Sequence, residues 1–355
     1  MVIFGAGASH GSRADDDVID AGAVAGRRVY RPPVTAGLFD ERFGEYASKY
    51  PSSRPAIVRL RQAPRDRPTL LIEQEIGNLY QEASTNPERV RQLLALRFYL
   101  QDLIESETNK WSELFHGITL YTNLLERLGT WRSRSREPIV LVTFNYDTLI
   151  DRSVEDQTAN WHLTTFASHI KRDDWRLYKL HGSTAWRRDV PAAVSWTDPQ
   201  AVISHADEID VSRGHLIIAK TGELEQKAKR QAEFEDPDER TVQILGIAVP
   251  TSLKQTFECP TDHLRSFIAE IGKIDRLLTI GCRAAEPHAV ELLAEHIRPG
   301  YELAICDIAD HDVATIHANL ALAGRRGRGP HAFVGGFEGL LSSDDLERWL
   351  ELPIL

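Results

Sequence analysis

The sequence predicts an α/β fold, in which a Rossmann-like parallel sheet carries a helical insertion module. Short runs of branched apolar residues, typical of buried parallel strands, occur at residues 2–4, 139–144, 277–280 and 302–306. Each run ends in small or turn-forming residues and leads into a helical pattern, as at 287–296. The long segment between the first two runs has helical rather than strand periodicity.

The helical module is expected over residues 31–135. Its clearest helix is predicted at 86–107, where the Asn86 side chain can cap the first turn and Pro87 suits the first helical position. Leucine, isoleucine and valine then recur on one broad face of this helix. A second helix, with the same kind of apolar face, is predicted at 111–128.

We interpret the whole chain, residues 1–355, as one elaborated domain. Residues 189–245 are predicted to form a surface excursion, with a short strand at 216–219 and a densely charged stretch at 223–240. A binding element is the alternative interpretation of that segment. The Rossmann-like core then comprises residues 1–30, 136–188 and 246–355, and the chain closes with a helix at 344–355.

Composition narrows the class of protein. A hydrophobic content of 42% supports a large core, and a formal net charge of -10 argues against direct nucleic-acid binding, which needs clustered Lys and Arg. The three cysteines, Cys259, Cys282 and Cys306, are too far apart for a zinc knuckle or a disulfide framework, so no metal is expected. No apolar run approaches the roughly 18 to 20 residues that span a bilayer. We expect a cytoplasmic protein that does not bind membranes.

A glycine-rich turn follows the first predicted strand, with the sequence Gly5-Ala6-Gly7-Ala8-Ser9. Such a turn lets the backbone approach a pyrophosphate, although small residues are also used there for packing alone. His10 stands where the dehydrogenase fingerprint has its third glycine, and no strand ends in an acidic residue about 20 positions later. The sequence therefore argues against a hydride-transfer enzyme but leaves dinucleotide binding open.

Polar residues also follow two further predicted strands. Asn145 and Asp147 come directly after the strand at 139–144, and His181 follows another predicted strand at 177–180. Taken singly, Asn145 and Asp147 could cap the next helix, and His181 could be structural. Three polar strand ends in one parallel sheet, counting the glycine turn, instead favour one shared pocket at its carboxyl edge.

These motifs together resemble those of the sirtuin-like (SIR2) family. The glycine turn is similar to the family's Gly-Ala-Gly-x-Ser, residues 143–147 to its Thr-x-Asn-x-Asp, and residues 180–183 to its histidine-glycine motif. Residues 280–283 and the strand ending at Asp307 resemble its adenosine-side segments. The resemblance implies a sirtuin-type fold, with Asn145 and His181 as catalytic residues. It implies NAD+ contacts from Gly5, Ala6, Gly7, Ala8, Ser9, Thr143, Asp147, Ser183, Gly281, Cys282 and Asp307.

The chain lacks the two Cys-x-x-Cys pairs of protein deacylases and instead resembles the bacterial SIR2-like branch, through Arg31-Pro-Pro33 and the long helical insert. That resemblance implies an NAD+ glycohydrolase (NADase), a hydrolase that depletes NAD in abortive-infection antiphage defence. It also implies a homo-oligomer, a separate activating partner such as a HerA-like ATPase or an Argonaute-type protein, or both. A nucleotide sensor that leaves NAD or ADP-ribose intact and a protein ADP-ribosyltransferase are the alternatives.

Overall fold

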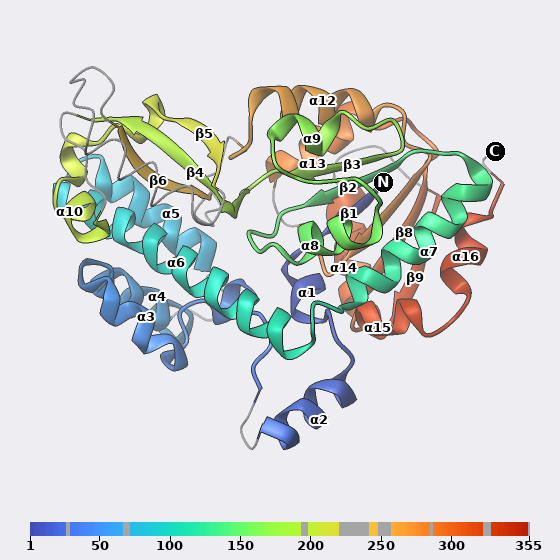
Figure 1. Cartoon of the computed structure of the whole chain (residues 1–355), viewed down its shortest axis with the longest axis horizontal. Coiled ribbons are helices and arrows are strands. Elements are labelled where there is room, and N and C mark those ends of the chain that lie inside the picture. The colour runs from blue at the N-terminus through green and yellow to red at the C-terminus, as the bar shows by residue number, and fades with distance from the viewer. Residues whose placement is uncertain are drawn as a thin grey trace. The chain divides into compact units, whose positions relative to one another are not determined.

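A computed structural model describes residues 1–25, 29–66, 72–192, 198–219, 241–247, 257–284, 287–321 and 328–353. The chain divides into two compact units (Figure 1). Unit 1 comprises Met1–Val34, Thr108–His181 and Cys259–Leu355, and unit 2 comprises Thr35–Glu107 and Gly182–Glu258.

Unit 1 is built on a six-stranded sheet in which every neighbouring pair is parallel. The strand order is β3-β2-β1-β7-β8-β9, which corresponds to the Rossmann-type order 3-2-1-4-5-6 once the strands of unit 1 alone are counted. The predicted α/β class with a Rossmann-like parallel sheet is therefore confirmed. The strands are β1 (Val2–Phe4), β2 (Ile139–Thr143), β3 (Trp175–Lys179), β7 (Arg276–Ile280), β8 (Glu302–Asp307) and β9 (Arg328–Val334).

The strand order reverses between β1 and β7. Phe4, at the end of β1, lies opposite Thr143 of β2 on one side and Ile280 of β7 on the other. Because all six strands run the same way, their carboxyl ends share one edge, and the crevice beside the reversal is where ligands of such sheets bind. The glycine turn after β1 and Gly281 after β7 flank this point.

Helices cover both faces of this sheet. On one face, the strands contribute Phe4 and Leu141, both fully buried, to a core that also includes Tyr121 and Val154 from the covering helices. Burying a large apolar side chain contributes roughly 1.5–3 kcal/mol, so this layer holds the strand ends firmly. The helices on this face are α7 (Leu120–Ser135), α8 (Leu149–Gln157), α15 (Gly336–Leu341) and α16 (Asp345–Leu350).

On the opposite face, Tyr178 of β3 contacts the second layer of helices. Its hydroxyl lies 2.8 Å from Ser266 Oγ, and its ring packs on Phe267. Both partners belong to α12. The helices of this layer are α9 (Phe166–Ile170), α12 (Thr261–Ile271) and α13 (Pro287–His296), while α1 (Ala6–His10), α2 (Asp15–Ala25) and α14 (Asp310–Ala321) complete the unit.

The helix predicted at 111–128 is divided between two helices. Its first residues continue α6 (Pro87–Leu114), and the remainder belongs to α7. His116 and Gly117 separate them with positive φ angles of 52° and 76°, which a continuous helix does not allow. Thr119 then starts α7 with a capping box. Periodicity missed this break because the apolar face resumes immediately after it.

Unit 2 contains a three-stranded antiparallel sheet of order β5-β4-β6. Its core includes Val190, Val242 and Ile244, all fully buried. The strands are β4 (Gly182–Pro191), β5 (His215–Ile218) and β6 (Thr241–Ile247). The helices of at least six residues are α3 (Gly44–Lys49), α4 (Arg54–Asp66), α5 (Ile72–Ala83), most of α6, and α10 (Pro199–Ser204).

The division of the chain differs from the one expected from the sequence. Residues 108–135, assigned to the helical insert, belong to unit 1, because α7 packs its Tyr121, Leu124 and Leu128 into the core of the parallel sheet. The described parts of the expected surface excursion include α10, β5, most of β6 and the end of β4, with a buried core. The charged stretch at 223–240 lies outside the described residues.

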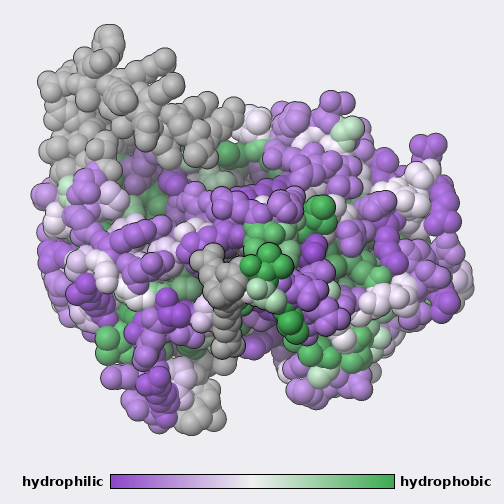
Figure 2. All heavy atoms as spheres, turned by 60° about the horizontal axis from the view of Figure 1, so that its bottom comes forward, coloured by the Kyte–Doolittle hydropathy of each residue, from purple (hydrophilic) through white to green (hydrophobic). Residues whose placement is uncertain are grey.

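The surface drawn in Figure 2 is mainly hydrophilic, with smaller hydrophobic areas between the hydrophilic ones. Among the described helices, none combines the length and the apolar character needed to cross a membrane.

Candidate functional site

The sequence-predicted residues of unit 1 lie at the carboxyl ends of its strands, the edge at which Rossmann-type sheets bind ligands. Gly7, Phe144, Cys282 and Asp307 follow or end four neighbouring strands, and all four are partly exposed. Asn145 and His181 are only 6% and 2% exposed. The edge therefore has a partly exposed rim above two buried polar side chains.

Asn145 is bound directly to the glycine turn. Its Nδ2 donates to the Gly5 carbonyl oxygen at 2.8 Å and to Ser9 Oγ at 2.9 Å. Its backbone N–H donates to Thr143 Oγ1 at 3.0 Å, which bends the chain as it leaves β2. The amide oxygen makes no hydrogen bond with the described residues and is the atom of Asn145 that can serve a ligand.

Tyr121 completes this network, although the sequence predicted it only as one apolar residue on the buried face of a helix. Tyr121, fully buried on α7, has its hydroxyl 3.0 Å from Ser9 Oγ and 3.5 Å from Asn145 Nδ2. Burial raises the pKa of Tyr121 well above its ordinary value, so the phenol stays protonated. Nothing in the apolar spacing of α7 distinguished Tyr121 from its leucine neighbours.

Asp147 lies beside the same network and shapes the start of α8. Its Oδ1 accepts from the Leu149 N–H at 3.0 Å, which is the helix-initiating interaction considered from the sequence. Burial raises the pKa of Asp147, against the lowering effects of the Lys179 charge and of a hydrogen bond from Ser9. Asp147 thus has a local structural role, and any contact with a ligand would be additional.

The glycines of the turn are required by close packing against the loop after β7. A Cβ on Gly5 would lie 2.4 Å from the Gly281 carbonyl oxygen, and one on Gly7 would lie 2.9 Å from Gly281 Cα. Gly281 itself has a φ of 56°, and a Cβ there would meet the Ala8 nitrogen at 2.3 Å. Packing of β1 against β7 therefore explains these three glycines without a ligand.

The backbone amides of the turn are largely used within the protein. Gly5 N–H donates to the Ile280 oxygen at 3.1 Å, Gly7 N–H to the Gly281 oxygen at 3.1 Å, and Ala8 N–H to the Gly5 oxygen at 2.9 Å. These three amides are not available to a pyrophosphate in this conformation. The turn brings the backbone close to the crevice, so a pyrophosphate bound there in this conformation would be held by other groups.

His181 lies among aromatic rings at the end of β3. Its ring centroid is 4.9 Å from Phe144 and 6.4 Å from Tyr146, the residues on either side of Asn145. The ring of His288, near the start of α13, stacks on it at 6.0 Å. No hydrogen bond joins His181 to Asn145 in the described structure. The sequence interpretation missed His288, because one histidine in an amphipathic helix carries no distinguishing signal.

The remaining predicted contacts fall into two groups. Asp307 ends β8, and its Oδ1 accepts from the neighbouring Ile308 N–H at 2.8 Å, while burial raises the pKa of this carboxyl. Ala6 and Cys282 are partly exposed along the same edge as Asp307. Ser183 belongs to β4 of unit 2, where its Oγ accepts from the Ala185 N–H at 3.2 Å.

Among the described residues, no three or more His, Cys, Asp and Glu side chains are grouped so that they could hold a metal ion. The residues already named bring amide, hydroxyl, imidazole and carboxyl groups to the candidate site.

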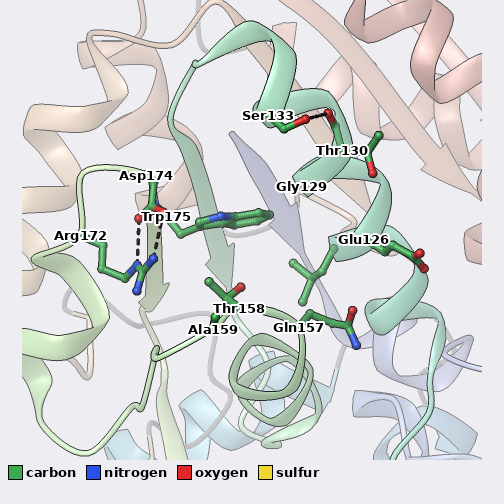
Figure 3. A pocket seen from close by; sticks show the side chains of 11 residues that line it. Glu126, Gly129, Thr130, Ser133, Gln157, Thr158, Ala159, Arg172, Asp174 and Trp175 are labelled. Atoms are coloured by element: carbon green, nitrogen blue, oxygen red, sulfur yellow. Dashed lines mark hydrogen bonds and ion pairs between the residues drawn. The ribbon is translucent and has the colours of Figure 1, made fainter.

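A separate pocket of about 530 Å³ opens at the other end of β3 (Figure 3). The Trp175 side chain lies at its centre. Beside it, Arg172 and Asp174 form a bidentate ion pair, with N···O distances of 2.8 and 2.9 Å. The pocket shares no lining residue with the candidate site. It is open, and its exposed rim includes Glu126, Gln157 and Ala159.

Comparison of the chain with protein-family models and with curated proteins finds no match. Its function is therefore inferred from its own residues.

The geometry allows a defined chemistry at this edge. The Asn145 amide is held by three partners, so its free oxygen has a fixed direction and can accept a hydrogen bond from a hydroxyl or a water. His181 supplies an imidazole, the side chain best suited to accept a proton near neutral pH. Such a pair can bind a sugar hydroxyl and assist attack by water.

Proposed function

We propose that the protein is an NAD+ glycohydrolase of the SIR2 type. It would cleave the bond between nicotinamide and ribose and release nicotinamide and ADP-ribose. The observation that carries the proposal is the direct hydrogen bonding of Asn145 Nδ2 to Gly5 O and Ser9 Oγ, which joins two of the resembling motifs at the strand reversal. A third motif brings His181 next to the residues that flank Asn145.

The chemistry of the bond suits these groups. Nicotinamide leaves as a neutral molecule from a positively charged ring, so the leaving group needs little acid catalysis. The difficult steps are stabilising an oxocarbenium-like ribose and admitting one water molecule. A buried amide and an imidazole can do this without a strong acid.

Each residue has a role in this proposal. The Asn145 Oδ1 accepts a hydrogen bond from a ribose hydroxyl or from the attacking water. His181 accepts the proton that the water or the hydroxyl loses. Asp147, at the same turn, contacts the nicotinamide amide or orients the loop, while Gly281, Cys282 and Asp307 lie toward the adenosine. The phosphates pass over the glycine turn and are held by groups other than the Gly5, Gly7 and Ala8 amides.

The resemblance also supports a proposal for the role of NAD cleavage in the cell. Uncontrolled loss of NAD is toxic, so the enzyme would act in the cytoplasm only when triggered, as in abortive infection by phage. Self-assembly or a separate activating protein, of the HerA-like ATPase or Argonaute type, would supply the trigger. This part of the proposal is supported by the sequence motifs alone.

Two other functions use the same pocket. A sensor would bind NAD or ADP-ribose without releasing nicotinamide, and an ADP-ribosyltransferase would attach the ADP-ribose to protein. The presence of both Asn145 and His181 counts against a sensor, because binding alone does not need a group that accepts a proton from water.

The test is an assay of free nicotinamide after incubation of the purified protein with NAD. The wild-type protein should release nicotinamide and free ADP-ribose, and His181→Ala should lose at least about 100-fold in kcat. His162→Ala, at an exposed position in the same unit, is the control and should retain activity. Release by His181→Ala at the wild-type rate would contradict the role of His181. ADP-ribose recovered on protein would instead indicate transfer.

A further inference from the structure

A fully buried lysine lies beneath the candidate site. Lys179, the last residue of β3, has 0% exposure and stands two positions before His181. Burying an ammonium group is costly unless the group is paired and hydrogen-bonded, because it loses its hydration. An apolar residue would fill this place in the sheet at lower cost, so the lysine needs a reason.

Its ammonium group makes two short contacts. Lys179 Nζ donates to Asp151 Oδ2 at 2.7 Å and to the Asp147 carbonyl oxygen at 2.7 Å. Asp151 lies on α8 and is 9% exposed, and Asp147 belongs to the turn that connects β2 to α8. One buried cation therefore ties three elements together, the end of β3, the turn after β2 and the first turn of α8.

The two contacts differ in what they require. An apolar pair of similar volume can replace a buried ion pair with little loss of stability. A buried backbone carbonyl needs a hydrogen-bond donor. Removing Lys179 takes away the donor that binds the Asp147 carbonyl oxygen. The ion pair with Asp151 neutralises the charge, while the bond to Asp147 O fixes the turn.

We propose that Lys179 is a positioning residue, which sets the placement of Asn145 relative to His181 by joining the turn after β2 to the end of β3. Asn145 is two residues before the carbonyl that Lys179 binds, and His181 is two residues after Lys179. A shift of the turn by about 1 Å would displace the Asn145 amide from a reacting centre shared with His181, at a cost of up to ~100-fold in rate. This inference rests on the proposed NAD+ cleavage.

The test compares three variants and one control variant with the wild-type protein. Lys179→Met removes the ammonium group and leaves Asp151 buried without its partner. Lys179→Met combined with Asp151→Leu removes both charges, and should recover much of the melting temperature lost by the single variant. Asp151→Asn keeps an oxygen acceptor for Lys179 and leaves the bond to Asp147 O in place. Arg176→Met is the matched control, since Arg176 on the same strand is paired with Glu270 at 3.5 Å.

The expected result is a split between stability and turnover. The double variant should regain stability yet keep a kcat at least about tenfold below wild type, with KM for NAD changed less than about threefold. Asp151→Asn and Arg176→Met should keep kcat within about threefold. A folded double variant that turns over NAD at the wild-type rate would overturn the inference.

A second measurement does not depend on activity. Amide hydrogen exchange should be at least about tenfold faster at Asn145 and Leu149 in the double variant. Asn145 N–H donates from the turn to Thr143 Oγ1 at the end of β2, and Leu149 N–H donates to Asp147 Oδ1 in the turn, so both bonds depend on the turn that Lys179 holds. Exchange within β2 should be unchanged. If the wild-type protein releases no nicotinamide, the proposed function fails, and the exchange data alone decide whether Lys179 fixes the turn. If both amides of the double variant exchange at the wild-type rate, the claim that Lys179 fixes the turn is overturned as well.

Discussion

Asn145 donates from Nδ2 to Ser9 Oγ at 2.9 Å, a hydrogen bond between residues 136 positions apart in the sequence. Ser9 also lies 3.0 Å from the Tyr121 hydroxyl, so one serine links the turn after β1, the turn after β2 and helix α7. All three side chains are buried, and the direction of the Asn145 amide is therefore set by the fold before any ligand binds.

Ser9→Ala should weaken both the fold and the site. The change removes one of the partners of Asn145 Nδ2 and one of those of Tyr121, within a buried network. The free energy of unfolding should fall by about 1–2 kcal/mol, as measured by urea denaturation, and nicotinamide release should fall with it. Ser48→Ala, at an exposed position where Oγ donates to the Gly44 oxygen, is the control. Equal stability of the two variants would argue against the network.

Gly5→Ala should destabilise the protein through backbone overlap. The new Cβ would lie 2.4 Å from the Gly281 oxygen and 2.6 Å from Cys282 Cα, and neither of these backbone atoms can move independently of β7. We expect a loss of about 3 kcal/mol, measured by thermal unfolding, since insertion into a close-packed region typically costs 1–3 kcal/mol or more. Gly44→Ala, where nothing lies within 4 Å, is the control and should be neutral or slightly stabilising. A Gly5→Ala protein as stable as wild type would show that the two loops can separate.

Acidic pH should destabilise unit 1 through a buried histidine. Burial lowers the pKa of His169 to about 4, while nearby Asp151 opposes the shift and the charges of His263 and Lys179 add to it. Between about pH 6.5 and pH 4 the unfolded chain therefore binds a proton that the folded protein excludes, so stability falls as the pH falls. The contribution is of the order of 3 kcal/mol over this window. Asp147, whose pKa is raised, acts in the opposite direction and offsets part of the loss at the acidic end.

The variant His169→Asn tests this dependence. It keeps a side-chain donor in place of the Nδ1 that bonds to the Thr165 oxygen at 2.9 Å, but it cannot titrate. Urea denaturation at pH 7.5, 6 and 5 should give a shallower slope for this variant than for wild type. His162→Asn, at an exposed site, should leave the slope unchanged. If the free energy of unfolding of His169→Asn changes with pH as steeply as that of wild type, the acid sensitivity belongs to other groups.

Much of unit 1 follows from local patterns. The branched apolar runs correctly located β1, β2, β7 and β8, because strands buried on both faces need apolar residues at every position. β9 was not anticipated, since it lies at the sheet edge and is mostly exposed. The three-stranded sheet of unit 2 was also underestimated, because its strands lie close to charged segments that mask their periodicity.

The sequence by itself determined that polar motifs follow the strands of a parallel sheet, since apolar periodicity and turn residues are properties of neighbouring positions. Only the tertiary structure decided that Asn145 is bound to Ser9, that Gly5 and Gly7 face Gly281, and that Lys179 lies buried beneath the turn. The physical reason is that strand order and helix packing depend on contacts between residues far apart in the chain. A lysine or glycine therefore acquires its role from partners that no local pattern specifies.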